Sequence, residues 1–120
     1  MSSTVGQPKT KLNIVMGAAT FGEEGRPAVR IHDLDEIEAL LDIFRLHGHT
    51  DVDTAYFYTG GTSEVVLGKI DWKSKGLKLE TKLPAIFDIK SHLLKSLKAL
   101  DSEYVKPLWI SLEFRAQFLL

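Results

Sequence analysis

Short apolar runs alternate with longer helical patterns along the chain, and this alternation constrains the fold more than any other feature. The apolar runs predict strands over residues 12–16, 50–54, 77–82 and 107–112. The spacing of apolar residues between them predicts three helices, which are capped by Asp33, by Thr62 or Ser63, and by Asp88. Strict alternation of strand and helix predicts a parallel sheet. Each helix carries the chain back to the end of the sheet where the previous strand began, so the next strand runs in the same direction.

Two architectures share this order of elements, an open doubly wound sheet and an α/β barrel. A dinucleotide-binding open sheet has the pattern G-x-G-x-x-G directly after its first strand, and the spacing of the glycines here does not match it. Polar residues stand at the C-terminal ends of consecutive predicted strands, at Asp53, Lys82 and Ser111. Barrels of this class keep their active sites at that end.

The barrel is therefore the favoured architecture. A complete barrel takes about 250 residues, whereas this chain has 120 residues. Four strands and three helices predict an α/β fold that forms the N-terminal half of a (β/α)8 TIM barrel.

The composition excludes several classes of function. Cysteine is absent, which excludes disulfide bonds, thiolate zinc sites and thiol catalysis. The 15 basic and 16 acidic residues are spread along the sequence, so no nucleic-acid partner is expected. Residues 1–10 lack the apolar core of a signal peptide, and no apolar run approaches membrane-spanning length. We expect a cytoplasmic protein that does not contact a membrane.

Asp53, Tyr58 and Lys82 have the chemistry of a general acid that protonates a carbonyl oxygen. A phenol titrates near pH 10, but an ammonium group about 4 Å away, at an effective dielectric constant near 20, favours the phenolate by roughly 4 kcal/mol, or about three pK units at most. A carboxylate beside the lysine keeps it protonated. In the alternative, Asp53 caps a loop, Lys82 is a solvated strand-end charge and Tyr58 is a surface aromatic. Residue types and spacing alone favour that structural alternative.

Several motifs around these residues occur together in one enzyme family. The sequence is Asp-Thr-Ala-Tyr-Phe-Tyr at 53–58, Gly-Gly-Thr-Ser-Glu at 60–64, Leu-Gly at 67–68 and Glu-Thr-Lys at 80–82. A Leu-Lys-Ser-Leu-Lys-Ala-Leu-Asp segment follows at 94–101. Over about residues 11–105 the chain resembles the aldo-keto reductases. Met16-Gly17 and the short loops resemble the aflatoxin-aldehyde reductase subgroup.

The resemblance implies an NADP(H)-dependent oxidoreductase that reduces a small-molecule aldehyde or ketone to an alcohol within a TIM barrel. It implies that Tyr58 is the proton donor and that Lys82 lowers the pKa of Tyr58. Asp53 would hold the lysine in place and also touch the nicotinamide ribose. The resemblance implies no metal.

The resemblance ends after Val105. The family continues with a fourth strand that ends in a histidine which orients the carbonyl, whereas Ser111 stands at that position here. Residues 106–120 also have no counterpart of the strands that bind the cofactor phosphates. We expect a disordered segment at 1–10, a partial aldo-keto reductase domain at 11–105 and a divergent segment at 106–120, as in a truncated or altered product.

This ending gives a second functional hypothesis, a non-catalytic remnant that lacks the histidine and the phosphate site. The isolated 120-residue chain is expected to be inactive. A half-barrel also leaves two sheet edges open, so self-association through these edges is expected.

Two further motifs have competing interpretations. His47-Gly48-His49, close to Asp53, has the donor types of a metal site, but a helix that ends at Gly48 also accounts for His47. Residues 60–63 precede a helix and could hold an anion or form a plain capped loop. We favour the helix end as the explanation for His47, and the plain capped loop as the explanation for residues 60–63.

Overall fold

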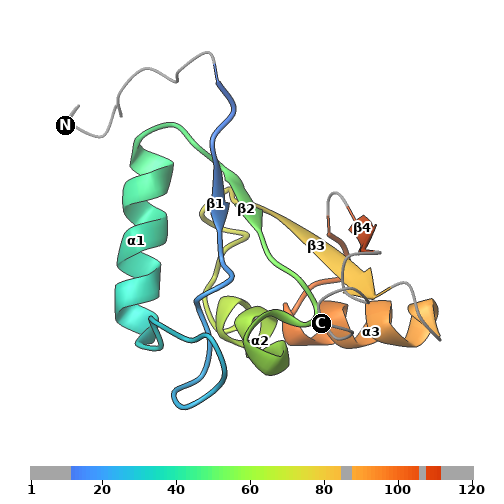
Figure 1. Ribbon diagram of the computed structural model, residues 1–120. Helices are drawn as coiled ribbons and strands as arrows, with labels where there is room; N and C mark the ends of the chain where they lie inside the picture. Colours follow the sequence, from blue (N-terminus) through green and yellow to red (C-terminus); the bar gives the residue numbers. More distant parts are fainter. Residues whose placement is uncertain (1–11, 85–87, 106–107, 112–120) are drawn as a thin grey trace.

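The computed structural model describes residues 12–84, 88–105 and 108–111 (Figure 1). Strands and helices alternate along this part of the chain, as the sequence predicted. The elements are β1 (Val15–Gly17), α1 (Leu34–Leu46), β2 (Asp51–Asp53), the 3-10 turn η2 (Tyr58–Gly61), α2 (Thr62–Gly68), β3 (Lys78–Pro84), α3 (Ile89–Ala99) and β4 (Leu108–Ser111). The segment at 1–10 and the divergent segment at 106–120, apart from β4, lie outside the described residues.

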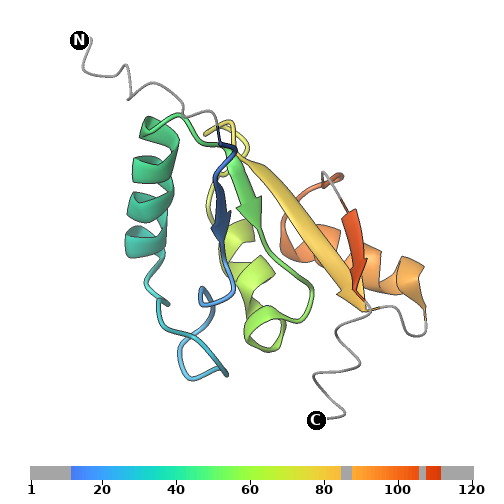
Figure 2. The ribbon, with the colours of Figure 1, turned by 45° about the horizontal axis from the view of Figure 1, so that its top comes forward.

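The four strands form one parallel sheet in the order β1-β2-β3-β4. Each strand pairs with the next one along the chain, so Asp51 lies beside Val15 on one side and Lys78 on the other. β3 pairs with β4, where Pro84 lies opposite Ser111. All four arrows point toward the same edge of the sheet (Figure 2). The C-terminal ends of the strands are therefore gathered at that edge.

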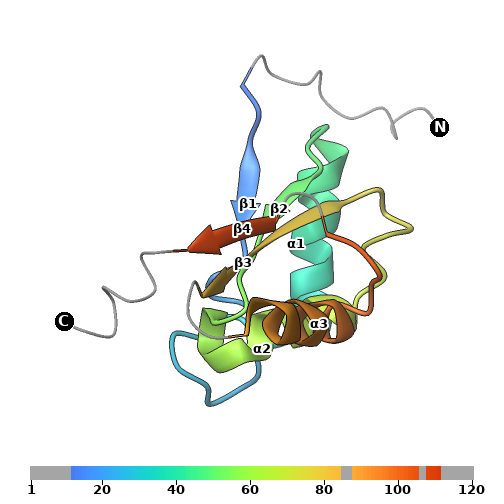
Figure 3. The ribbon, with the colours of Figure 1, turned by 90° about the vertical axis from the view of Figure 1, so that its right-hand side faces the viewer.

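The helices form one layer against one face of the sheet (Figure 3). Alternate strand positions such as Val52 and Leu79 are buried under this layer. The intervening positions carry polar residues, among them Asp51, Asp53 and Lys82, which are half-buried on the other face. The buried core that joins sheet and helices includes Ile37, Leu41, Phe44, Val52, Val66, Leu67, Leu79 and Leu100. No helix among the described residues is long and apolar enough to cross a membrane.

Local signals explain where α1 begins and ends. The Asp33 side chain accepts hydrogen bonds from the backbone N–H groups of Asp35 and Glu36, at 2.8 and 3.1 Å, and so satisfies two donors that the helix leaves free. The helix ends at His47, and Gly48 follows with φ +87°. A residue in this left-handed conformation ends a helix, and glycine adopts it without strain.

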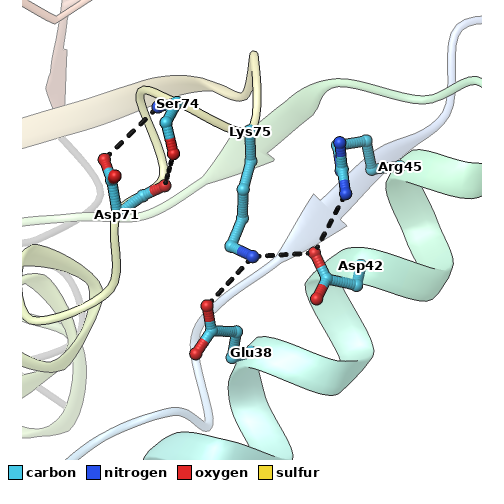
Figure 4. Close-up of polar contacts among 6 residues, drawn as sticks. All are labelled: Glu38, Asp42, Arg45, Asp71, Ser74 and Lys75. Atoms are coloured by element: carbon cyan, nitrogen blue, oxygen red, sulfur yellow. Dashed lines mark hydrogen bonds and ion pairs between the residues drawn. The ribbon is translucent and has the colours of Figure 1, made fainter.

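Lys75 ties the loop that precedes β3 to α1 (Figure 4). Its Nζ lies 2.9 Å from a Glu38 carboxylate oxygen and 2.8 Å from an Asp42 carboxylate oxygen. The hydrogen bond to Asp42, with a second to Glu38, raises the pKa of Lys75, and the same bond to Lys75 lowers the pKa of Asp42. Both groups therefore stay charged at neutral pH and hold the loop against the helix.

Two local predictions were wrong. β1 begins at Val15 rather than at Leu12, whose side chain is 72% exposed. Gly61, at φ +91°, is the N-cap of α2 in place of Thr62 or Ser63. Within α3, which was predicted with Asp88 as its cap and has Asp88 as its N-cap, the buried residue is Ser96.

Candidate active site

The C-terminal edge of the sheet brings the polar ends of β2 and β3 together. Asp53 is the last residue of β2 and lies opposite Glu80. Pairing continues past the strand, because the backbone N–H of Thr54 donates to the Glu80 carbonyl and that of Tyr56 donates to the Lys82 carbonyl, both at 2.9 Å. The side chains of Asp53 and Lys82 therefore emerge close together on the face of the sheet that none of the described helices covers, which we call the open face.

Lys82 and Asp53 form a close ion pair. The Lys82 Nζ lies 2.5 Å from Asp53 Oδ1 and donates a second hydrogen bond to the Thr54 carbonyl at 2.8 Å. Burial acts to lower the pKa of Lys82, but the hydrogen bond to Asp53 and the contact with Tyr58 outweigh it, so the pKa is raised. The ammonium is therefore charged at neutral pH. The ion pair of Lys82 stabilises the folded state fully at a pH below the ordinary lysine pKa. This contribution is lost as the pH rises through the raised pKa of Lys82.

Tyr58 joins this pair from the turn η2. Its hydroxyl donates to Asp53 Oδ2 at 3.3 Å, and the Lys82 Nζ lies 4.9 Å from the centroid of its ring. The ring of Phe57 stands edge-on to that of Tyr58 at a centroid distance of 5.5 Å. The structure thus brings together all three residues singled out in the sequence, around one carboxylate.

The turn that carries Tyr58 has an unusual backbone. Thr59 has φ +51°, and Gly60 and Gly61 have φ +67° and +91°. A β-branched residue in the left-handed region is strained, so surrounding contacts must hold it there. The Thr59 hydroxyl lies 2.7 Å from the Tyr58 carbonyl oxygen and 3.1 Å from the Phe21 carbonyl oxygen.

The loop between β1 and α1 packs directly on this turn. A side chain added at Gly22 would lie 2.5 Å from the Thr59 hydroxyl oxygen, so only glycine permits the approach. The Glu23 backbone N–H donates to the Thr62 hydroxyl at 3.1 Å, and Arg26 donates to the Gly60 carbonyl at 3.1 Å. The loop that follows β1 therefore holds the turn η2 in place.

Ser63 and Glu64 are buried polar residues whose contacts the sequence did not predict. The Ser63 hydroxyl donates to the Ala18 carbonyl at 2.9 Å. The Glu64 carboxylate is 1% exposed and accepts hydrogen bonds from the hydroxyls of Thr81 and Ser96, each at 2.7 Å. The Gly-Gly-Thr-Ser-Glu motif marked both residues, but their partners lie far along the chain.

A cavity of about 400 Å³ lies beside the turn but not at the three-residue cluster. It is lined by Tyr56, Phe57, Gly60, Gly61, Glu64, Lys95 and Ala99. Asp53, Tyr58 and Lys82 do not line it. A substrate that reacts at Tyr58 would therefore approach from the open face of the sheet rather than through this cavity.

The remaining candidate residues do not join the cluster. His47 is the C-cap of α1, and the His49 ring lies 5.2 Å from that of Phe44. Within the described ranges no three histidine, aspartate or glutamate side chains form a group that could hold a metal ion. Ser111 is the last residue of β4 and pairs with Pro84 near the same edge of the sheet.

Similar proteins are aldo-keto reductases, although no protein-family model matches the sequence. The aldo-keto reductase pigE of Monascus ruber is 38% identical, in a match that covers 79% of this chain and 33% of that protein. An aldo-keto reductase of Pseudocercospora fijiensis (strain CIRAD86) is 37% identical, in a match that covers 59% of this chain and 28% of that protein. The chain thus spans about one third of the length of the curated relatives it matches.

Solved structures give the same result for the fold. The putative aldo-keto reductase PA4992 of Pseudomonas aeruginosa matches with a TM-score of 0.68 at 24% identity, over 82% of this chain and 42% of that one. The thermostable aldo-keto reductase Tm1743, solved with the inhibitor epalrestat, matches with a TM-score of 0.57 at 27% identity, over 82% of this chain and 39% of that one.

These neighbours are TIM barrels, and the described sheet with its helices is part of the same (β/α)8 fold, which confirms the predicted fold class. In sequence and in fold the chain is therefore similar to part of proteins named as aldo-keto reductases.

Proposed function

We propose that the chain carries the proton-transfer group of an NADP(H)-dependent carbonyl reductase, with Tyr58 as the general acid. The observation that supports this most is the meeting of three groups. The Asp53 carboxylate accepts a hydrogen bond from the Tyr58 hydroxyl at 3.3 Å and from the Lys82 ammonium at 2.5 Å. A phenol beside a half-buried ammonium can release its proton, because the ammonium stabilises the negative charge left on the ring oxygen.

The residues around Asp53 fit a cofactor ribose. Gly17 lies opposite Asp53 in the β1–β2 pairing, and a side chain added at Gly17 would meet no atom within 4 Å. Open space therefore lies beside the carboxylate, whose oxygens can each accept another hydrogen bond from a sugar hydroxyl. When bound, a nicotinamide cofactor would supply the hydride that reduces the carbonyl carbon.

In the proposed reaction Tyr58 gives its proton to the carbonyl oxygen as hydride reaches the carbon, and the product is an alcohol. Lys82 stays protonated because its pKa is raised. The Asp53 carboxylate accepts hydrogen bonds from both Lys82 and Tyr58, and so holds these two side chains beside each other. The substrate is a small aldehyde or ketone. The aflatoxin-aldehyde reductase subgroup stays a prediction, which Met16-Gly17 supports, and a cytoplasmic location stays a prediction as well.

The proposal is tested in a completed barrel, a hybrid protein in which residues 12–105 replace the aligned third of the Monascus ruber relative. The rest of that relative supplies the missing strands. We expect this hybrid to oxidise NADPH when a small aldehyde is added, and we expect Lys82→Met and Asp53→Asn to lose most of that activity. Unchanged rates in both variants would remove the cluster from the reaction.

The isolated chain is expected to bind NADPH poorly or not at all. Asp53 offers one contact to the nicotinamide ribose, whereas the resemblance assigns the phosphate contacts to strands beyond residue 105. Phosphate contacts supply much of the binding free energy of a charged dinucleotide. A fluorescence titration of the purified chain with NADPH checks this, and saturation in the micromolar range would contradict it.

Ser111 favours a second candidate, the non-catalytic remnant. It stands at the end of β4, where the resemblance expects the histidine that orients the carbonyl. A hydroxyl has neither the reach nor the titration of an imidazole. The nucleotide sequence that follows codon 105 distinguishes the two candidates. Further barrel strands in another reading frame would support the reductase, and their absence would support the remnant.

We also propose that the 120-residue chain self-associates through the outer edge of β1. In the described part of the sheet this edge has no neighbouring strand. Apolar side chains accompany it, since Ile14 and Val15 are 41% and 40% exposed. An unpaired strand edge with apolar side chains pairs readily with another chain. Sedimentation of the chain should show dimers or larger species, and a monomer that melts cooperatively would contradict this.

A further inference from the structure

We propose that Glu64 is a positioning residue, whose buried carboxyl group holds the turn that carries Tyr58 against the strand that carries Lys82. This inference rests on the proposed function, since it explains how the proposed acid and its ammonium partner are kept together. Glu64 itself touches neither group.

Glu64 is costly to bury. It is 1% exposed, and none of the ion pairs among the described residues includes it. Burial raises the pKa of its carboxyl group, and the hydrogen bonds from Thr81 and Ser96 oppose this rise only in part. An apolar residue of similar volume would avoid the cost of desolvating a carboxylate. A buried acid kept at this cost indicates a role beyond stability.

The two hydroxyl partners join Glu64 to different elements. Thr81 lies on β3, directly before Lys82, and Ser96 lies on α3. Side chains alternate along a strand, so Thr81 points under the helix layer while Lys82 points to the open face, as their exposures show. The hydrogen bond from Thr81 to Glu64 therefore fixes the backbone of β3 beside Lys82, and it lies on the helix side of the sheet, opposite the open face.

The segment that carries Tyr58 is tied at both ends to these same two residues of β3. At its start, the Tyr56 backbone N–H donates to the Lys82 carbonyl at 2.9 Å. At its end, Glu64 accepts the hydrogen bond from the Thr81 hydroxyl at 2.7 Å. Tyr58 lies between the two ties, in the turn that leads directly into α2.

The hydrogen bond of Tyr58 within the cluster is a weak one. Its hydrogen bond to Asp53 is long, at 3.3 Å, and the residue that follows, Thr59, has a strained backbone. The position of the phenol relative to Lys82 therefore depends on where the turn is anchored. Glu64 supplies that anchor on the β3 side.

The test compares two variants of the chain that each remove one hydrogen bond from the same carboxylate. Thr81→Val keeps the shape of the side chain and removes the bond to β3, whereas Ser96→Ala removes the bond to α3. The readout is the nuclear Overhauser effect between the Tyr58 ring and the Lys82 side chain, measured well below the melting temperature. A movement of about half an ångström nearly halves this signal, because the signal falls with the sixth power of distance.

We expect Thr81→Val to lower the Tyr58–Lys82 signal by about half, a movement of the size that degrades a preorganised site. Ser96→Ala should leave the signal unchanged, and Thr81→Ser should restore it. Equal signals in Thr81→Val and the wild type, with only a lower melting temperature, would overturn the inference. Equal losses in Thr81→Val and Ser96→Ala would overturn it as well, since they would show that the carboxylate only stabilises the fold.

Two substitutions of Glu64 keep the inference testable if Thr81→Val does not fold. Glu64→Gln can still pair with both hydroxyls, whereas Glu64→Met has a similar volume, cannot pair and removes the buried charge. The signal should survive in the first and fall in the second, and equal signals would overturn the inference. If the wild-type chain shows no Tyr58–Lys82 signal, the proposed cluster itself fails, and that result is distinguishable from a failure of Glu64 alone.

Discussion

Replacing Tyr58 by phenylalanine in the completed barrel is expected to lower the rate of carbonyl reduction by at least about 100-fold. The phenolic proton is transferred in the transition state, so its loss affects catalysis more than binding. The ring would keep its contacts with Phe57 and with the Lys82 ammonium. NADPH binding, measured by fluorescence titration, should therefore change little.

Tyr56→Phe is the matched control for this prediction. Tyr56 lies two residues away, and its ring contacts the His92 ring in a tilted arrangement at a centroid distance of 4.9 Å. Removal of its hydroxyl should leave the reaction rate unchanged. Wild-type turnover in Tyr58→Phe would exclude Tyr58 as the acid, and equal losses in both variants would indicate a general effect on the segment.

Gly68→Ala is expected to be the most destabilising small substitution in the described part of the fold. Gly68 ends α2 where that helix meets the end of α3, and an added side chain would overlap the carbonyl oxygen of Ala99. A backbone carbonyl cannot rotate away as a flexible side chain can, so the two helices must separate. We expect a loss of about 3 kcal/mol, or a fall of about 15 °C in the melting temperature.

Gly17→Ala provides the control for Gly68→Ala. A side chain at Gly17 would meet no atom within 4 Å, and its backbone is not in the left-handed region. Its effect on the free energy of unfolding should stay within about 0.5 kcal/mol. Thermal unfolding followed by circular dichroism compares the two variants. A melting temperature of Gly68→Ala equal to that of the wild type would show that α2 and α3 are not packed as closely as described.

Signals between residues close in sequence explain the parts of the fold that were predicted. Asp33 and Gly48 mark the ends of α1 through contacts made within a few residues. The positions of Asp53 and Lys82 at the ends of consecutive strands were enough to predict that they meet, because parallel strands end at one edge. The same argument does not fix the position of Tyr58, which depends on the turn that follows β2.

Contacts between distant residues account for what the sequence did not show. Ser63 was expected to cap α2 because hydroxyl residues favour that position. Its hydroxyl instead reaches the carbonyl of Ala18, 45 residues earlier in the chain. Glu64 likewise pairs with Ser96, 32 residues later. No local sequence pattern identifies partners so far away. The motif at 60–64 therefore drew attention to Ser63 and Glu64, but it did not show what their side chains contact.

The most direct measurement of the central claim follows hydride into the product. The completed barrel is supplied with a small aldehyde and with NADPH that carries deuterium at the transferable position of the nicotinamide, and the alcohol is analysed by mass spectrometry. If the cluster of Asp53, Tyr58 and Lys82 performs the proposed reaction, the alcohol carries one deuterium on the former carbonyl carbon, and Tyr58→Phe forms almost none. A folded hybrid that binds NADPH and yields unlabelled alcohol, or no alcohol, would contradict the account.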